Sequence, residues 1–202
     1  MDRESPNEVQ HEIDYAEILK TSTLPIDLHG TVIGSFGSDV EAREIWNTVF
    51  AFLQVFGASL NLEGLDAVTV ADDYVSALAG IDRGFVTTQA PSPTGDEFGA
   101  GFAMSVPVIR EGILKSHIVL DSRLIRPLLD PKSELYGIAV HTLCHEAAHA
   151  HDHLIQSRAF PGLYGTSIPD YRDGVLLNLA FGCWDEYIAS RLSAPWGPPG
   201  LL

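Results

Sequence analysis

Apolar residues recur every three or four positions between Asp39 and Gly57, with polar residues between them. This spacing predicts an amphipathic helix of about four to five turns, because residues three and four apart share one helix face. Ser38 or Asp39 is placed to cap its start, and Gly57 is placed to end it. The repeating apolar positions are Ala42, Ile45, Trp46, Val49, Phe50, Leu53 and Phe56.

Four other segments have the pattern of β-strands. Residues 23–33 alternate apolar and polar side chains, as a half-buried strand does, and residues 67–70 form a short apolar run. Two more strands are predicted at 102–109 and 113–120. The residues between them, Arg110-Glu111-Gly112, are typical of a hairpin turn.

The remaining elements are predicted to be helical. Asp72 or Asp73 is placed to cap a short helix that reaches Leu78. Asp130-Pro131 predicts the opening of a long helix, because the carboxylate can cap it and proline suits its first position. A loop rich in Gly, Pro and Tyr, from about 160 to 173, then separates this helix from a second long one.

Strands with one main helix come first and two long helices come last. We therefore expect an α+β fold with helices stacked on one face of a small sheet. The expected organisation is an acidic lead-in at 1–22, a single domain at 23–194 and a Pro/Gly-rich tail at 195–202. The tail is not expected to be helical, but it can pack back on the domain through Trp196. Residues 87–101 hold several Pro and Gly and are expected to form a surface loop.

Composition narrows the class of protein. The chain has 202 residues, and its 12 Lys and Arg against 27 Asp and Glu give a formal charge of −15. Such an acidic chain is not expected to bind nucleic-acid phosphates or anionic membranes through bulk charge. The sequence has no apolar leader and no run long enough to span a bilayer, so a cytoplasmic location is expected.

The main chemical signal is the motif His145-Glu146-x-x-His149 within the first long helix. Histidines four residues apart share one helix face, so both imidazoles can reach one metal ion. Zinc accepts such nitrogen ligands and, in catalytic sites, keeps one position for water. The adjacent Glu146 can then take a proton from that water as a general base.

The opposite face of this helix is expected to pack on the core, which leaves the two histidines directed toward a cleft. The predicted core-facing residues are Tyr136, Val140, Leu143, Ala147, Ala150 and Leu154.

A third metal ligand is expected from the last helix, because no histidine follows His153. Glu186 is the favoured candidate and Asp185 the weaker one, since Asp185 points about 100° away from it. Four residues of the last helix are small, so this helix is expected to approach the motif helix closely: Gly182, Cys183, Ala189 and Ser190.

A motif helix followed by Glu186-Tyr187-Ile188-Ala189 resembles the gluzincin branch of zinc metallopeptidases. Asp185 stands where that branch has an asparagine. Small single-domain members, such as the minigluzincins and the ImmA/IrrE-type regulatory peptidases, are similar over about residues 100–194. The resemblance implies a zincin-like fold, with a small mixed sheet packed on the motif helix and a glutamate-bearing helix after it.

The resemblance also implies one Zn²⁺ ion held by His145, His149 and Glu186, with Glu146 as the catalytic base. The expected activity is hydrolysis of a peptide or protein substrate, bound in extended form along one of the strands 102–109 and 113–120. The alternative is a non-catalytic zincin-like module that binds or regulates a protein and holds a structural zinc.

Several neighbours of the motif leave their roles open. His141, Asp152 and His153 are expected to form a polar rim on an exposed helix, although Asp152 could instead orient a ligand imidazole. Arg191 could hold a carboxylate. Three tyrosines are possible oxyanion donors, although packing is the more ordinary role for each: Tyr164, Tyr171 and Tyr187. The two cysteines, Cys144 and Cys183, are expected to be small buried apolar side chains.

Overall fold

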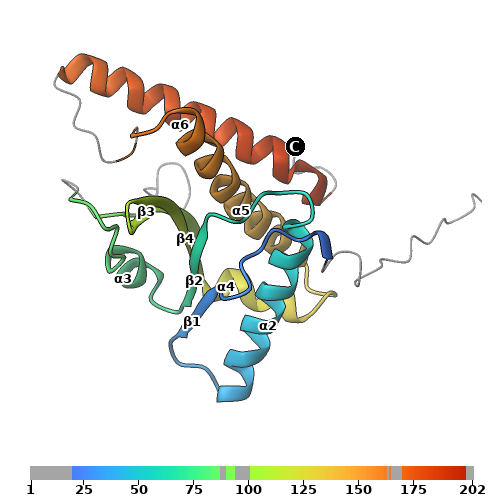
Figure 1. The fold of residues 1–202 in the computed structure, drawn as a ribbon. Helices are drawn as coiled ribbons and strands as arrows, with labels where there is room; N and C mark the ends of the chain where they lie inside the picture. Colours follow the sequence, from blue (N-terminus) through green and yellow to red (C-terminus); the bar gives the residue numbers. More distant parts are fainter. Residues whose placement is uncertain (1–19, 87–89, 94–100, 163, 165–169, 199–202) are drawn as a thin grey trace, which may run out of the picture.

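A four-stranded mixed sheet lies at the centre of the computed structural model, which describes residues 20–86, 90–93, 101–162, 164 and 170–198 (Figure 1). The strand order is β1-β2-β4-β3. Strands β1 (His29–Ile33), β2 (Leu65–Ala71) and β4 (Ile113–Asp121) are parallel, and β3 (Ala103–Arg110) pairs antiparallel with β4. The β3–β4 hairpin was predicted from the sequence. Because β3 is last in the strand order, it is an edge strand.

The first predicted strand is too long. Only its last five residues, His29–Ile33, form β1. Upstream of them the N–H of Leu28 donates to the carbonyl of Pro25, and Thr23 bonds to Gly57 instead of a strand. Proline has no N–H to give to a sheet, so this stretch turns before the sheet begins.

The described residues form five α-helices. The first two, α2 (Asp39–Phe56) and α3 (Tyr74–Ala79), start where the sequence predicts. The caps are also those expected, since Ser38 accepts the N–H of Glu41 and Asp73 that of Ser76. The remaining helices are α4 (Ser122–Ile125), α5 (Tyr136–Ala159) and α6 (Tyr171–Ser193). A 3₁₀ turn, η2 (Arg126–Leu129), follows α4.

The predicted helix start at Asp130-Pro131 is wrong, because α5 begins six residues later, at Tyr136. The Asp130 carboxylate does accept a backbone N–H, from Lys132, and its carbonyl accepts that of Ser133. These bonds close an isolated turn rather than the first turn of the helix.

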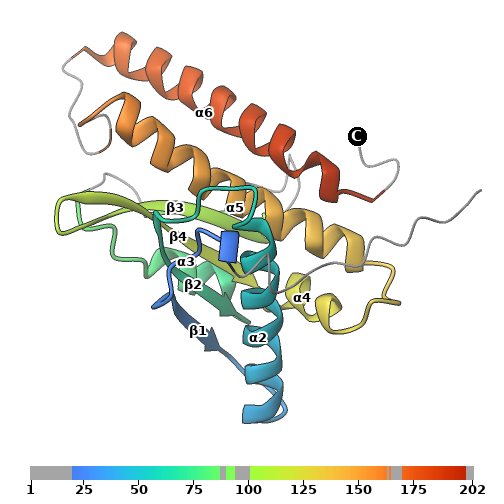
Figure 2. The ribbon, with the colours of Figure 1, turned by 45° about the vertical axis from the view of Figure 1, so that its right-hand side comes forward.

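The helices form layers around the sheet (Figure 2). Helices α2 and α5 pack on one sheet face around buried side chains such as Phe56, Ile118 and Leu143. The short α3 packs on the other face with Val106, Val108 and Val119. Helix α6 packs chiefly on α5 and is the outermost layer.

The tail differs from the prediction at its start. Ala194–Trp196 forms a 3₁₀ turn, η3, rather than an extended segment. Trp196 packs edge-on against Phe56, with ring centroids 4.9 Å apart. The described part of the tail therefore packs against α2 through Trp196.

Some predictions fall outside the described residues. They concern almost all of the lead-in at 1–22, most of the loop at 87–101, part of the loop at 160–173 and the last four residues of the tail. Among the helices that are described, none combines the length and the apolar character needed to cross a membrane.

Candidate metal centre

Three side chains from two helices converge at one point between α5 and α6. His145 and His149, one turn apart on α5, direct their Nε2 atoms at each other at 3.0 Å. Glu186 on α6 brings one carboxylate oxygen to 3.4 Å from the His145 Nε2 and the other to 3.7 Å from the His149 Nε2. These are the three ligands that the sequence predicted, and together they could hold a metal ion.

The spacing of these atoms fits a tetrahedral ion. Ligand nitrogens and oxygens about 2.0–2.2 Å from a zinc ion lie about 3.3–3.6 Å from one another when the geometry is tetrahedral. The observed separations of 3.0, 3.4 and 3.7 Å scatter around that value. Among the described residues, two imidazole nitrogens and one carboxylate converge, and this is the protein ligand set of one class of catalytic zinc site.

Asp185 approaches the centre from behind rather than as a ligand. Its Oδ1 lies 3.0 Å from Nδ1 of His149, on the side of the ring away from Nε2. Both atoms are buried, and neither has another partner among the described residues. A carboxylate at this nitrogen fixes the tautomer that presents Nε2 to a metal.

The same carboxylate reaches a second histidine. The other oxygen of Asp185 lies 3.6 Å from Nε2 of His153, whose Nδ1 is 2.9 Å from the hydroxyl of Ser116 on β4. A buried polar chain therefore runs from the candidate centre through Asp185 and His153 to the sheet. It fixes the position of α6 relative to α5 at the level of the ligands.

Glu146 is buried between α5 and β3, with 6% of its surface exposed. The backbone N–H of Ser105, on β3, donates to its carboxylate. Burial raises the pKa of Glu146, against the lowering effect of the nearby His149 and His145. A carboxylate whose pKa is raised toward neutrality is a stronger proton acceptor than an exposed one.

The charges of the cluster favour one cation held among carboxylates. Burial acts to lower the pKa of His149, but Asp185, Glu146 and Glu186 outweigh it and raise that pKa to about 9. Burial also acts to raise the pKa of Asp185, yet its bonds to His149 and His153 hold it well below its usual range. The hydrogen bond to His145 lowers the pKa of Glu186. A divalent ion would satisfy the same carboxylates that now favour a proton on His149.

A cavity of about 420 Å³ opens in front of these groups. Its walls come from β3, α5 and α6, so the edge strand and the candidate ligands share one space. The lining residues are Ala103, Met104, Ser105, His145, Glu146, His149, Asp185 and Glu186.

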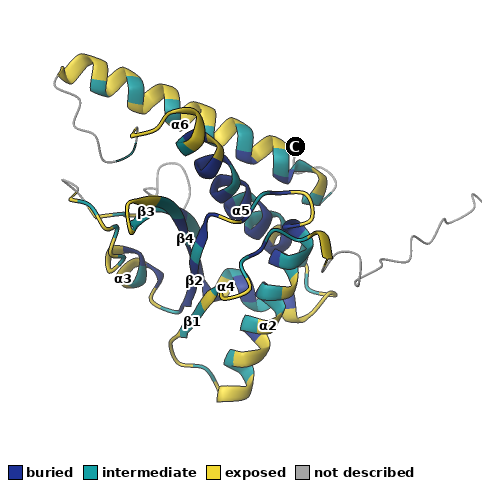
Figure 3. Cartoon of the chain, viewed as in Figure 1, coloured by how far each residue is buried: buried dark blue, intermediate teal, exposed yellow. Residues whose placement is uncertain are grey.

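The helix face that carries the motif is more enclosed than the sequence suggests. The predicted core stripe of α5 is buried as expected, with only Tyr136 partly exposed. Asp152 and His153 are buried as well, at 4% each, so the prediction of a polar rim on an exposed helix is wrong. Helix α6 covers this face (Figure 3). Asp152 binds the amide of Gln156 and does not orient a ligand.

The predicted contact face of α6 is partly wrong: Ala189 is buried as expected, but Ser190 is exposed. Gly182 and Cys183 are exposed rather than packed on α5, and a Cβ added to Gly182 would meet no atom within 4 Å. The residues that face α5 are Asp185, Ala189 and their helical neighbours, which rotates the helix by about a quarter turn or more from the prediction. Of the two cysteines, Cys144 is buried as expected, and Cys183 is not.

The remaining candidates lie away from the ligands. The hydroxyl of Tyr164 donates to Gln156, while Tyr171 and Tyr187 are exposed. Arg191 contacts the hydroxyl and the ring of Tyr187 and holds no carboxylate among the described residues. None of the three tyrosines lines the cavity at the candidate centre.

Sequence reasoning missed two contributors, Asp185 as the acceptor behind His149 and the Ser105 N–H at Glu146. A signal for the first exists, because His145, His149 and His153 repeat every four residues and so extend the polar face toward an acidic neighbour of Glu186. The second has none, since a backbone N–H leaves no mark in the sequence.

Comparison with known proteins adds no identification. No protein-family model matches the chain, and neither the curated proteins nor the solved structures contain a significant match.

Proposed function

We propose that this protein is a zinc-dependent peptidase of the zincin type, with His145, His149 and Glu186 as metal ligands. The observation that carries the proposal is the convergence of two Nε2 atoms and a carboxylate beside a buried glutamate, at distances that suit one tetrahedral ion. Three ligands in the described part of the chain support a catalytic site over a structural one, because structural zinc sites are usually closed by four.

Zinc in such a site polarises the scissile carbonyl and lowers the pKa of bound water. The other tasks belong to the chain itself. Glu146 accepts the proton of the attacking water and can pass it to the leaving amine. Asp185 keeps His149 in the tautomer that binds metal, and the buried chain through His153 holds α6, and with it Glu186, in place.

The edge strand β3 is the proposed site for an extended substrate. Arg83 covers the far end of this edge, accepting the N–H of Ile109 and donating to the carbonyl of Pro107. Backbone groups alternate in direction along a strand, so Ala103 and Ser105 present theirs to the same edge, where the Ser105 N–H already donates to Glu146. Within the described part of the chain no other backbone segment pairs with these two residues, and both line the cavity at the ligands. A substrate strand added here would lie across the metal site.

Replacing Glu146 by glutamine tests the proposal. The substitution keeps the size of the side chain but removes its basicity, so we expect stoichiometric zinc with a loss of about a thousandfold in kcat/KM. Zinc is measured by mass spectrometry of metal content, and hydrolysis by following a diverse peptide library. The matched control is Glu134→Gln, an exposed glutamate just before α5, which should change neither.

The outcomes separate the alternatives. Undiminished hydrolysis in Glu146→Gln would refute the mechanism, and absence of zinc binding would refute the metal site. Bound zinc with no cleavage of any peptide, and equal peptide binding by both forms, would favour a non-catalytic zincin-like module.

A further inference from the structure

Helix α6 exposes apolar side chains on the face turned away from α5. Leu176 is 55% exposed, Leu179 61% and Tyr187 55%, and Cys183 between them is exposed as well. On a helix these four side chains lie within about 80° of one another, so they form one stripe. Figure 3 shows α6 exposed along most of its length, in contrast to the buried α5 beneath it.

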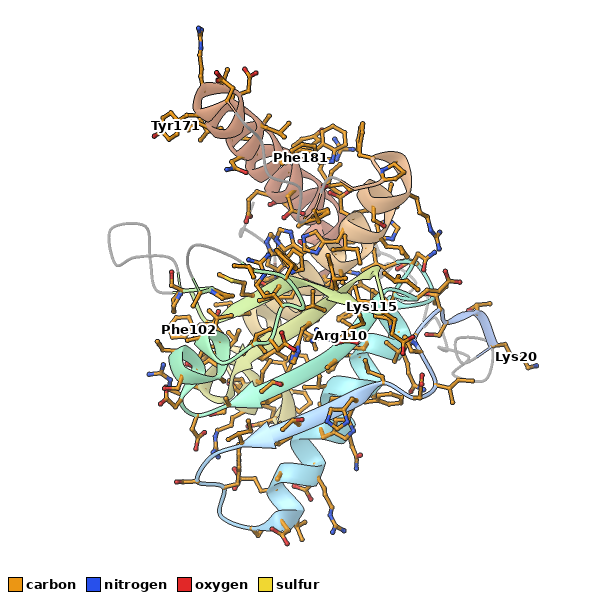
Figure 4. All side chains as sticks on the ribbon, turned by 60° about the vertical axis from the view of Figure 1, so that its left-hand side comes forward. Lys20, Phe102, Arg110, Lys115, Tyr171 and Phe181 are labelled. Carbon is orange, nitrogen blue, oxygen red and sulfur yellow. The ribbon has the colours of Figure 1, made fainter. Side chains whose placement is uncertain are left out.

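The stripe continues into an apolar hollow between α6 and α5. This cavity has a volume of about 440 Å³, and its walls include Phe160, Phe181 and Trp184. Trp184 is 53% exposed and Phe160 56%. Figure 4 shows Phe181 along α6, in the part of the molecule away from the sheet. An exposed apolar surface of this extent on a helix is typical of a protein–protein contact.

We propose that this stripe, made of Leu176, Leu179, Cys183 and Tyr187, is the contact face of a two-fold symmetric dimer. In this dimer the α6 helices of two copies pack antiparallel. The inference does not depend on the metal or on peptidase activity.

The sequence of the stripe is complementary to itself when it is reversed. An antiparallel pair that places Leu176 against Tyr187 of the second copy also brings Leu179 beside Cys183. Because the axis is two-fold, each contact occurs twice. The midpoint of this register falls near residues 181 and 182, next to the small side chain of Cys183, and a Cβ on Gly182 would meet only open space.

Charges at the two ends of the stripe match in the same register. Asp173 lies in the first turn of α6 and Arg191 in the last, and both are exposed. They share one side of the helix about five turns apart, so each Asp173 meets Arg191 of the second copy. The stripe and these two residues carry no net charge, in a chain whose formal charge is −15. Two acidic copies would repel one another over most of their surface, but not across this face.

Hydrodynamic mass measures the proposal directly. The full chain should sediment as a dimer at about 100 µM and dissociate on dilution. Leu179→Glu places two carboxylates at the centre of the contact, which should weaken association at least about a hundredfold. The matched control is Val40→Glu, since Val40 is 62% exposed on α2 and away from α6. It should leave the dimer unchanged, and circular dichroism checks that each variant is folded.

A charge swap tests the register. Asp173→Arg or Arg191→Asp alone creates like-charge pairs at both ends of the dimer and should weaken it about tenfold. The double variant restores opposite charges and should recover most of the loss. Recovery cannot come from the helix itself, because both substitutions oppose the helix dipole and would add rather than cancel.

Cross-linking locates the axis. A short bismaleimide, which joins two thiols, should link two chains through Cys183 and should fail with Cys183→Ser, while the buried Cys144 does not react. A monomeric mass at about 100 µM would overturn the proposal. So would a dimer unaffected by Leu179→Glu, or a monomer in which Cys183 is protected from a maleimide because another part of the chain covers it.

Discussion

At the scale of single residues, the orientation of His149 is the feature on which metal affinity depends most. Its Nε2 serves the candidate ion only if Nδ1 carries the proton, and Asp185 is the group at Nδ1. Asp185 is in turn held by His153, so the ring is fixed from two sides. The sequence motif supplies three candidate ligands and one base, but it does not include Asp185, the acceptor that orients His149.

Asp185→Asn should lower zinc affinity about 10- to 100-fold, because an amide is a weaker acceptor at Nδ1 and orients the ring less firmly. Competition with a chelating dye measures the affinity. Asp152→Asn is the control, since Asp152 is a buried acid on α5 that binds Gln156. An equal loss of zinc affinity in both variants would show that any buried acid near α5 has this effect, and that the contact of Asp185 with His149 is not the cause.

His117 gives a pH dependence that is separate from the metal site. Burial lowers its pKa to about 4, with Asp66 opposing and Arg110 and His29 adding to the shift, and Thr69 bonds its ring at 2.9 Å. The unfolded chain protonates this histidine near pH 6.5, so between pH 6.5 and 4 the unfolded state binds more protons. The free energy of unfolding should therefore fall by about 2 kcal/mol through this one group as pH drops from 7 to 4.

His117→Gln should flatten that part of the stability profile, measured by urea unfolding of metal-free protein at several pH values. His29→Gln, at an exposed histidine on β1, should change the slope only slightly, because His29 is the weakest of the charges that act on the pKa of His117. If the slope survived in His117→Gln, another group would be responsible for it.

At the scale of elements, the edge of β3 decides whether an extended peptide can reach the ligands. Ala103→Pro removes an N–H that points to this edge. It removes no bond of the β3–β4 ladder, because Ala103 is an even number of residues from Ile109, whose N–H points away from β4. We expect KM for peptides to rise about tenfold, the worth of roughly one hydrogen bond, with kcat and zinc content little changed. The N–H of Val108 points the other way, toward β4, so Val108→Pro should instead break the ladder and destabilise the fold. An unchanged KM in Ala103→Pro would place the substrate elsewhere.

The elements also mark how far sequence patterns reach. The period of α2 and its Ser38 cap predict that helix closely, because both signals are local. The start of α5 could not be predicted, since Asp130-Pro131 can form an isolated turn as readily as the first turn of a helix. The rotation of α6 was missed for a different reason. Gly182 and Cys183 have the small size expected at a close helix contact, but a helix that is apolar all round does not reveal which side its neighbour occupies.

At the scale of the whole molecule, α6 is held chiefly by its packing on α5. Only Ala189 and Ser193 are buried along its 23 residues, and Trp196, just after the helix, packs against Phe56 of α2. The Glu186 side chain is 70% exposed and lies 3.4 and 3.7 Å from the two histidines, so a bound ion would add a direct link between α6 and α5.

Removing metal should consequently loosen α6 before the sheet. With a chelator present, we expect backbone amides of α6 to exchange with deuterium at least about tenfold faster, while those of β2 and β4 keep their rates, because local opening of α6 exposes little apolar core.

Saturating zinc should raise the midpoint of thermal unfolding, by an amount that grows with the logarithm of free zinc. Glu186→Gln should abolish both effects of zinc, whereas Glu134→Gln should preserve them. Equal acceleration of exchange in β2, β4 and α6 would mean that the metal supports the whole fold, and a response to zinc that persists in Glu186→Gln would place the ion at other residues.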